Sequence, residues 1–270
     1  MISVLNSVSQ LSAENALSST QASLQKTLQQ LSTGLKINSG SDDGAGLSIA
    51  SALGANISAL TQSSQNATNS IGFLQTADGA LSQVTTLLNR AVTLATEAAN
   101  GGLTANQLTA ADAEYTAIQN EITQIGSTTN FNGSQVFSAA ALNTFTSDGT
   151  ATGATTLATT TGVLSAAGLA IGTGTLATAA STELTAITAA IDTVSLTRGQ
   201  IGGDVNRLTA DVNVQNTQVT NLTSAQNNVQ NADISATVAK MTQYNVLQQT
   251  GMAALSQSNQ AAQSVLKLLQ

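Results

Sequence analysis

The 270-residue sequence contains no cysteine, histidine, proline or tryptophan. Without cysteine there are no disulfides and no thiolate chemistry, and without histidine there is no imidazole to act as a base or a metal ligand. The absence of proline removes the strongest helix breaker from the whole chain. These absences exclude most hydrolase and zinc-site arrangements and favour long, uninterrupted helices.

Charge is scarce as well, because only 8% of the residues are charged, against about 25% in an average soluble domain. Seven Lys and Arg against fourteen Asp and Glu give a net charge of −7, which argues against nucleic-acid binding, since that function requires a basic patch. The scattered carboxylates form no recognisable set of nucleophile, base and orienting group, so we expect neither an enzyme nor a cofactor or metal site.

The N-terminal residues have no basic stretch followed by a sustained apolar run, so we expect no Sec-type signal peptide. No run of about 20 consecutive apolar residues occurs, and we therefore expect no membrane span.

Two long segments place apolar residues at alternating three- and four-residue steps. This average spacing of 3.5 residues is typical of an α-helical coiled coil, because it keeps one seam facing a partner. In the segment 182–230, eleven of the fourteen seam positions are apolar: Leu184, Ile187, Ile191, Val194, Arg198, Ile201, Val205, Leu208, Val212, Gln215, Val219, Leu222, Gln226 and Val229. In the segment 46–99, the row is Leu53, Ile57, Leu60, Ser64, Ala67, Ile71, Leu74, Asp78, Leu81, Thr85, Leu88, Val92 and Ala95.

A third helix is predicted over 104–128, where Tyr115, Ile118 and Ile122 continue the same stepping. Asn100, Gly101 and Gly102 precede it and provide a helix stop and a turn. Such a short connection favours antiparallel neighbours, so 46–99 and 104–128 should form a helical hairpin beside the 182–230 helix.

The stretch NFNGSQVF at 130–137 places an Asn-Gly pair beside aromatic and β-branched residues, which predicts a β-hairpin near 130–140. The following Thr-, Ala- and Gly-rich segment, 141–180, has little periodicity and is interpreted as a loop or an irregular strand region. The predicted fold class is therefore mainly α: a long antiparallel helical bundle or coiled coil with a small β-hairpin region.

Both ends of the chain are amphipathic helices with thin apolar stripes. Stripes too thin to be covered within one chain have to be buried between chains, so these residues are the candidate self-assembly surface. They are Leu17, Leu24, Leu28, Leu31 and Leu35 at the N-terminal end and Ile234, Val238, Met241, Leu255, Leu266 and Leu269 at the C-terminal end.

Two polar features have competing interpretations. Asp42 and Asp43 are expected to form a turn and a helix N-cap, because two adjacent carboxylates alone are weak support for a metal site. Arg198 occupies a seam position; either its stem lies along the seam with the charged head in solvent, or it pairs with an acidic residue such as Glu97 or Asp78.

Four stretches resemble bacterial flagellin, the filament subunit, and they occur in that family's order. They are LQQLSTGLKINSGSDDGAGLSIASAL, QTADGALSQVTTLLNRAVTLATEAANG, TTNFNGSQVF and the C-terminal NADISATVAKMTQYNVLQQTGMAALSQSNQAAQSVLKLL. The resemblance covers nearly the whole chain apart from about 140–180. It implies discontinuous domains built from both termini: an inner-core coiled coil of 1–44 with 231–270, an outer-core bundle of 45–140 with 181–230, and a short variable surface segment at 141–180.

The resemblance also implies a function and partners. A minimal, core-only flagellin would polymerise into the extracellular flagellar filament for swimming motility after export in an unfolded state by the flagellar type III apparatus. Its expected partners are other flagellin subunits, hook-associated junction and cap proteins, and an export chaperone on the C-terminal segment. Nucleic acid and membrane are not expected partners.

Arg90, Leu94 and Glu121 align with flagellin positions that contact the innate receptor Toll-like receptor five. This chain departs from the pattern at Ala91, Val92 and Thr93, where stimulatory flagellins carry a second Arg and a Glu. Receptor binding is therefore a hypothesis that rests on the resemblance.

Two alternatives stay open. A hook-filament junction protein shares flagellin-like ends but does not propagate a filament; the nearly complete C-terminus and the minimal middle favour the propagating subunit. A secreted membrane-active protein would insert its amphipathic ends into lipid, but the acidic balance and the lack of Lys/Arg-rich polar faces argue against it. A liposome leakage assay would distinguish this membrane-active protein from a filament subunit.

Overall fold

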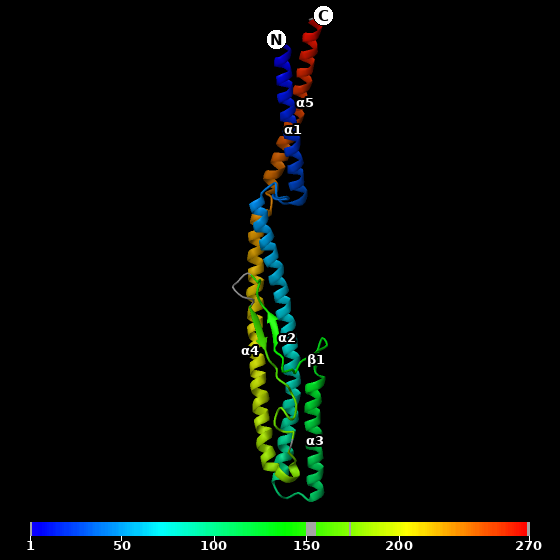
Figure 1. Cartoon of the computed structure of the whole chain (residues 1–270), viewed down its shortest axis with the longest axis vertical. Helices are drawn as coiled ribbons and strands as arrows, with labels where there is room; N and C mark the ends of the chain where they lie inside the picture. The colour runs from blue at the N-terminus through cyan, green and yellow to red at the C-terminus, as the bar shows by residue number, and fades with distance from the viewer. Residues whose placement is uncertain (1, 150–154, 173, 269–270) are drawn as a thin grey trace. The chain divides into compact units, whose positions relative to one another are not determined.

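The computed structural model describes residues 2–149, 155–172 and 174–268, and most of them are helical (Figure 1). The mainly α fold predicted from the sequence is confirmed. The helices are α1 (Ile2–Thr33), α2 (Gly44–Ala99), α3 (Ala105–Thr128), α4 (Leu176–Gln230) and α5 (Ile234–Leu268). The strands are β1 (Asn130–Phe131), β2 (Ser134–Gln135), β3 (Leu142–Phe145) and β4 (Thr156–Thr159).

The chain divides into two compact units. The terminal unit comprises Met1–Ala55 and Leu222–Gln270, and the central unit comprises Asn56–Asn221. The finer division predicted from the sequence, with boundaries after residues 44, 140, 180 and 230, stays a prediction.

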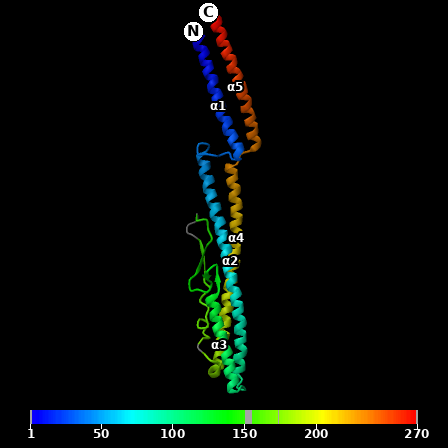
Figure 2. The same cartoon turned by 90° about the vertical axis from the view of Figure 1, so that its right-hand side faces the viewer.

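In the central unit, α2 and α4 run antiparallel, with α3 beside them (Figures 1 and 2). Ser63 of α2 accepts a hydrogen bond from Gln215 of α4 at 3.0 Å, whereas Asp78, further along α2, pairs with Arg198, which lies earlier in α4. Thr104 begins α3 with a capping box, in which its hydroxyl and the side chain of Gln107 satisfy each other's backbone N–H groups. The predicted antiparallel hairpin of α2 and α3 is confirmed.

The predicted seam of α4 is confirmed. Its fully covered positions recur every seven residues, and the intervening seam residues are half-buried, as expected for a helix that packs along one stripe. The buried members are Ile187, Val194, Ile201, Leu208 and Gln215.

The predicted seam of α2 is only half right. Leu60, Ala67, Leu74, Leu81, Leu88 and Ala95 are buried as expected. Ala50, Phe73 and Leu94 are buried elsewhere on the helix. A second buried row lies one residue earlier than predicted: Ser63, Ser70, Ala77, Val84 and Ala91. Most of these side chains are small, which lets the neighbouring backbone approach closely, while the larger residues that follow them lie half-buried at the edge of the contact.

Helix α2 is also long and apolar enough, by length and composition, to cross a membrane, and only 17% of its most apolar stretch is buried within the chain. A core helix of a soluble protein meets the same criterion, and Leu74, Leu81 and Leu88 of α2 lie in the core. The expectation of no membrane span considered only uninterrupted apolar runs, which this helix lacks.

The β-hairpin predicted near 130–140 is present as β1 and β2. Its turn residues Asn132 and Gly133 have φ values of 51° and 80°, the left-handed pair that a two-residue hairpin turn requires. Phe131 contacts Phe73 of α2 edge to face, with ring centroids 6.1 Å apart, and this contact fixes the hairpin against the bundle.

A second hairpin, β3–β4, lies in the segment interpreted as loop or irregular strand. Leu157 of β4 is buried in the core, and hydrogen bonds also hold the hairpin to the helices. Thr144 donates to Ser70 of α2 at 2.6 Å, and Gln215 of α4 donates to the carbonyl of Thr146 at 2.9 Å. Its strands, LNTF and TLAT, place Thr144 and Thr159 at buried positions, so the alternation of apolar and polar residues that predicts a strand is weak here.

The return from β4 to α4 passes over α3, where Tyr115 is fully buried. Its hydroxyl donates to the Glu183 carboxylate of α4 at 2.8 Å, and burial together with this carboxylate raises the pKa of Tyr115. Asp112 accepts from the backbone N–H of Leu176 at 2.6 Å and so caps the beginning of α4. These contacts fix the α4 N-terminus against α3.

Gly126 has no room for a side chain, because a Cβ there would lie 1.8 Å from the carbonyl oxygen of Leu164. We expect Gly126→Ala to lower the free energy of unfolding by about 2–3 kcal/mol, since backbone has to move to relieve the overlap. Thermal and urea unfolding followed by circular dichroism measures this. Ser127→Ala, at the exposed neighbouring position, is the control and should have little effect; equal stability of both variants would contradict the packing described here.

Candidate self-assembly surface

Helices α1 and α5 form an antiparallel pair in the terminal unit. Gln10 donates to Asn259 at 2.9 Å, and the backbones of Leu35 and Asn231 form an isolated antiparallel bridge at the other end. Between these points the helices lie close, because a Cβ on Gly251 would lie 3.4 Å from Leu17. Small side chains make this approach possible.

A groove of about 360 Å³ runs along the pair where these small residues face one another. It is lined by Ala13, Ala16, Leu17, Thr20, Leu247, Thr250, Gly251 and Ala254. The lining is apolar apart from two threonine hydroxyls, and Thr250 already bonds to the carbonyls of Val246 and Leu247 within its own helix.

Burial within this pair is unusually low. Among the side chains described in α1 and α5, those of Thr27 and Thr237 alone are buried, and each hydroxyl bonds to a carbonyl of its own helix. No described aliphatic side chain of either helix is buried within the single chain. The two-helix contact therefore leaves most of its apolar surface open to solvent.

The predicted assembly residues fall into three groups. Leu17, Leu24, Leu31, Leu35, Met241 and Leu255 are half-buried. Leu28, Ile234 and Val238 are exposed, with 47%, 47% and 39% of their surface accessible. Leu269 and the side chain of Leu266 lie outside the described residues.

Sequence reasoning left out a further exposed apolar set, with 45–57% of each side chain accessible: Val8, Leu11, Val246 and Leu247. Leu247 also lines the groove between the two helices. A search for one stripe per helix misses these residues, whereas a search for two apolar faces on each helix would have found them.

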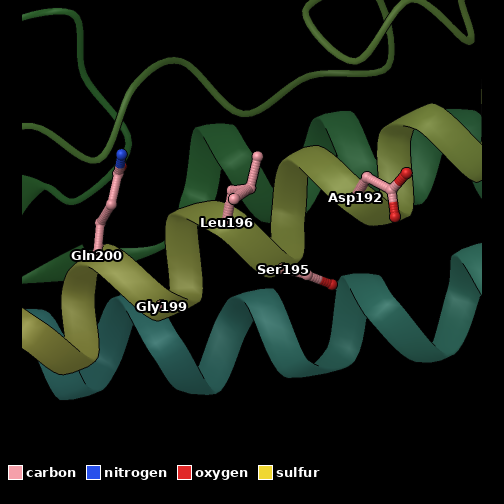
Figure 3. A pocket seen from close by; sticks show the side chains of 5 residues that line it. All are labelled: Asp192, Ser195, Leu196, Gly199 and Gln200. Carbon is pink, nitrogen blue, oxygen red and sulfur yellow. The ribbon is translucent and has the colours of Figure 1, made fainter.

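The central unit also carries exposed apolar side chains. Among those described, Leu196 on α4 has the largest exposed fraction, 70%. Figure 3 shows Leu196 and Gln200 projecting from the side of α4 opposite to Ser195, with Asp192 one turn away. The depression that they line is open and shallow, and α4 alone supplies its walls.

The residues of the receptor hypothesis are not equally accessible. Arg90 is exposed and makes a bidentate pair with Glu114 of α3, at 2.6 and 2.9 Å. This hydrogen bonding raises the pKa of Arg90 and lowers that of Glu114. Glu121 is exposed, but Leu94 is 3% accessible and belongs to the core of the central unit.

Arg198 pairs with Asp78, one of the two partners considered. Its Nε lies 2.8 Å from Asp78 Oδ1, and the hydrogen bond raises the pKa of Arg198. Both side chains are more than a third exposed, so water screens the pair and its contribution to stability is small.

Asp42 and Asp43 form the turn and cap that were predicted. Asp43 accepts from the N–H of Gly46 at 2.9 Å and caps the start of α2. Asp42 pairs with Lys26 at 2.7 Å and accepts from the N–H groups of Asn38 and Ser39, both at 3.1 Å. The Lys26 contact, followed by that N–H of Asn38, lowers the pKa of Asp42 from its ordinary value of 3.8 to about 2.

Comparison with known families identifies both halves of the chain. Residues 4–142 match the model of the bacterial flagellin N-terminal helical region, and residues 184–269 match that of the C-terminal helical region. The chain belongs to the bacterial flagellin family. These matched regions contain α2, α3 and α5, nearly all of α1, and α4 from residue 184 onwards.

Individual relatives agree with this assignment. The flagellin of Bacillus subtilis strain 168 is 31% identical, and the alignment covers 98% of each chain. The flagellar filament 33 kDa core protein of Treponema phagedenis is 29% identical, again over 98% of each chain. The crystal structure of Bacillus cereus flagellin superposes with a TM-score of 0.50 at 28% identity, covering 60% of this chain and 94% of that one. This flagellin is thus a structural subunit of the flagellar filament.

The Asp42 turn should make the terminal unit sensitive to acid. Because the folded-state pKa of Asp42 is depressed, its contribution is complete above pH about 4 and is lost as the pH falls towards about 2. We expect Asp42→Asn to flatten the pH dependence of unfolding in this window, measured by urea titrations at successive pH values. Asp192→Asn, on exposed α4, is the control; an Asp42→Asn variant with an unchanged pH profile would contradict the assignment.

Proposed function

We propose that this flagellin polymerises by burying the exposed apolar faces of α1 and α5 against the same helices of other copies. The observation that carries the proposal is the absence of buried aliphatic side chains among those described in α1 and α5. Hydrophobic burial is the main favourable term in folding and association, and in these helices it becomes complete only through further contacts. The ends of the chain then gain most of their order on assembly.

Charge supports the same mode of contact. Within α1 the charged residues are Glu14 and Lys26, and within α5 they are Lys240 and Lys267. With so few charges, neighbouring helices can approach without desolvating ion pairs, and packing of Ala, Ser, Thr and aliphatic side chains dominates. A repeated contact of this kind that does not close into a ring produces a helical filament.

The remaining parts of the proposal concern location and partners. The filament is extracellular, and the chain reaches it unfolded through the flagellar type III export apparatus. The lack of cysteine and proline suits this route, since neither cross-links nor slow prolyl isomerisation arise in transit. Hook-associated junction and cap proteins contact the filament at its two ends. A chaperone binds the C-terminal segment before export.

Leu28→Ser and Val238→Ser test the assembly surface. Both side chains are exposed in the single chain, so the unassembled protein should keep its stability. Each substitution removes about 1 kcal/mol of interchain burial and should raise the critical concentration for seeded polymerisation roughly fivefold. Sedimentation of filaments measures this, with electron microscopy to confirm their form.

The matched control is Gln25→Ser, an exposed polar position on the same helix as Leu28. Unchanged critical concentrations for Leu28→Ser and Val238→Ser would overturn the proposed surface. Leakage of liposomes by the full chain, in place of polymerisation, would favour the membrane-active alternative.

For receptor binding we propose a contact through Arg90 and Glu121, the exposed members of the aligned set. Monomer should stimulate a Toll-like receptor five reporter cell, and Arg90→Ala and Glu121→Ala should each reduce the response. Asp192→Ala is the control for loss of surface charge, and thermal unfolding verifies that each variant is folded. A silent unmodified monomer would remove this proposal.

A further inference from the structure

Four glycines lie inside the long helices of the central unit without a packing reason. They are Gly79 of α2 and Gly199, Gly202 and Gly203 of α4. A Cβ at any of them would meet no atom within 4 Å, and none has a positive φ. Within the described chain, neither close approach nor backbone conformation requires glycine at these positions.

The two groups of glycines lie at the same level of the antiparallel pair. Gly79 directly follows Asp78, Gly199 directly follows Arg198, and the Asp78–Arg198 ion pair joins the two helices at 2.8 Å. A weak point in one helix therefore faces a weak point in the other, although they are 120 residues apart in sequence.

Glycine weakens a helix because it loses more backbone entropy on ordering than alanine does. Each glycine makes local opening about fivefold more favourable than alanine would. The three glycines within five residues of α4 together raise the equilibrium constant for local helix opening about a hundredfold over alanine. Gly79 weakens the facing helix in the same way.

The turns on either side are well anchored. Val194 and Leu208 of α4, and Ala77 and Leu81 of α2, are buried in the core. Ile201, between the glycines, is also buried and keeps α4 attached on its inner side. Such an arrangement allows the helices to bend at this level without separating.

We propose that Gly79 together with Gly199, Gly202 and Gly203 forms a hinge in the α2–α4 pair, braced by the Asp78–Arg198 ion pair. The hinge is a property of the single chain and does not depend on polymerisation. Bending is centred on residues 199–203 of α4, and the exposed ion pair limits its amplitude.

Hydrogen exchange on the full-length, unassembled chain tests this directly. Amides over 199–206 should exchange faster than those of the turns around Val194 and Leu208. Gly199→Ala, Gly202→Ala and Gly203→Ala should each slow local exchange about fivefold, because alanine fits without contact. Arg198→Met should speed exchange in the same stretch, and Gln218→Ala, an exposed position on the same helix, is the control.

A distance measurement provides a second readout. The chain has no cysteine, so thiols introduced by Ala189→Cys and Val214→Cys give unique spin-label sites on α4 that flank the glycines, roughly 38 Å apart along the helix. The distance distribution should be broad with the native glycines and narrower when all four are alanine.

Exchange and distance distributions that do not change on alanine substitution would overturn the hinge. The same holds if the alanine variants behave like the native monomer but fail to polymerise, because the glycines would then serve contact with a neighbouring copy. Since both readouts use the monomer, a failure of the proposed assembly surface would leave this test unaffected.

Discussion

The structure depends on a mismatch between the length of its apolar stripes and the surface that one chain can cover. In the central unit, α2 has α3, α4 and two hairpins as neighbours, so residues such as Leu74 and Leu88 are fully buried. In the terminal unit, α1 has α5 as its described partner, and two helices in contact can cover only one stripe each. The same kind of sequence pattern is thus satisfied in one unit and left open in the other.

This difference explains how a chain with few aromatic residues and no cysteine both folds and assembles. The central unit builds a continuous core from Leu, Ile, Val and Ala, and it uses polar contacts such as Tyr115–Glu183 and Gln215–Thr146 to fix its connecting segments. The terminal unit has small residues along a groove and aliphatic residues on its outer faces. A well-packed core limits the central unit to one arrangement, while the open faces of the terminal unit provide the free energy for polymerisation.

Periodicity predicted the helices because their apolar rows are long, and the Asn-Gly pair predicted the first hairpin because its turn requires left-handed residues at Asn132 and Gly133. Periodicity could not place the seam of α2 to the residue, since alanine and serine fill positions such as Ser70 and Ala77 where large apolar side chains are expected. The β3–β4 hairpin escaped for a related reason: among its described residues Leu157 is the one buried aliphatic side chain, and its other contacts to the helices include hydrogen bonds of Thr144 and of backbone carbonyls. For the assembly surface, sequence identified Leu28 and Val238 but not Val8 or Leu11, because one stripe per helix was assumed.

An exposed ion pair and several glycines occur together at one level of the long helices. A coiled-coil seam tolerates an arginine when its head reaches solvent, and Arg198 meets this condition by pairing with Asp78 at the edge of the contact. A pair so exposed holds two helices together only weakly, and it lies beside glycines that weaken each helix. If rigidity alone were selected, alanine at Gly79 and Gly199 would be sterically free and would strengthen both helices. Glycine at both positions therefore agrees with the bending proposed at this level.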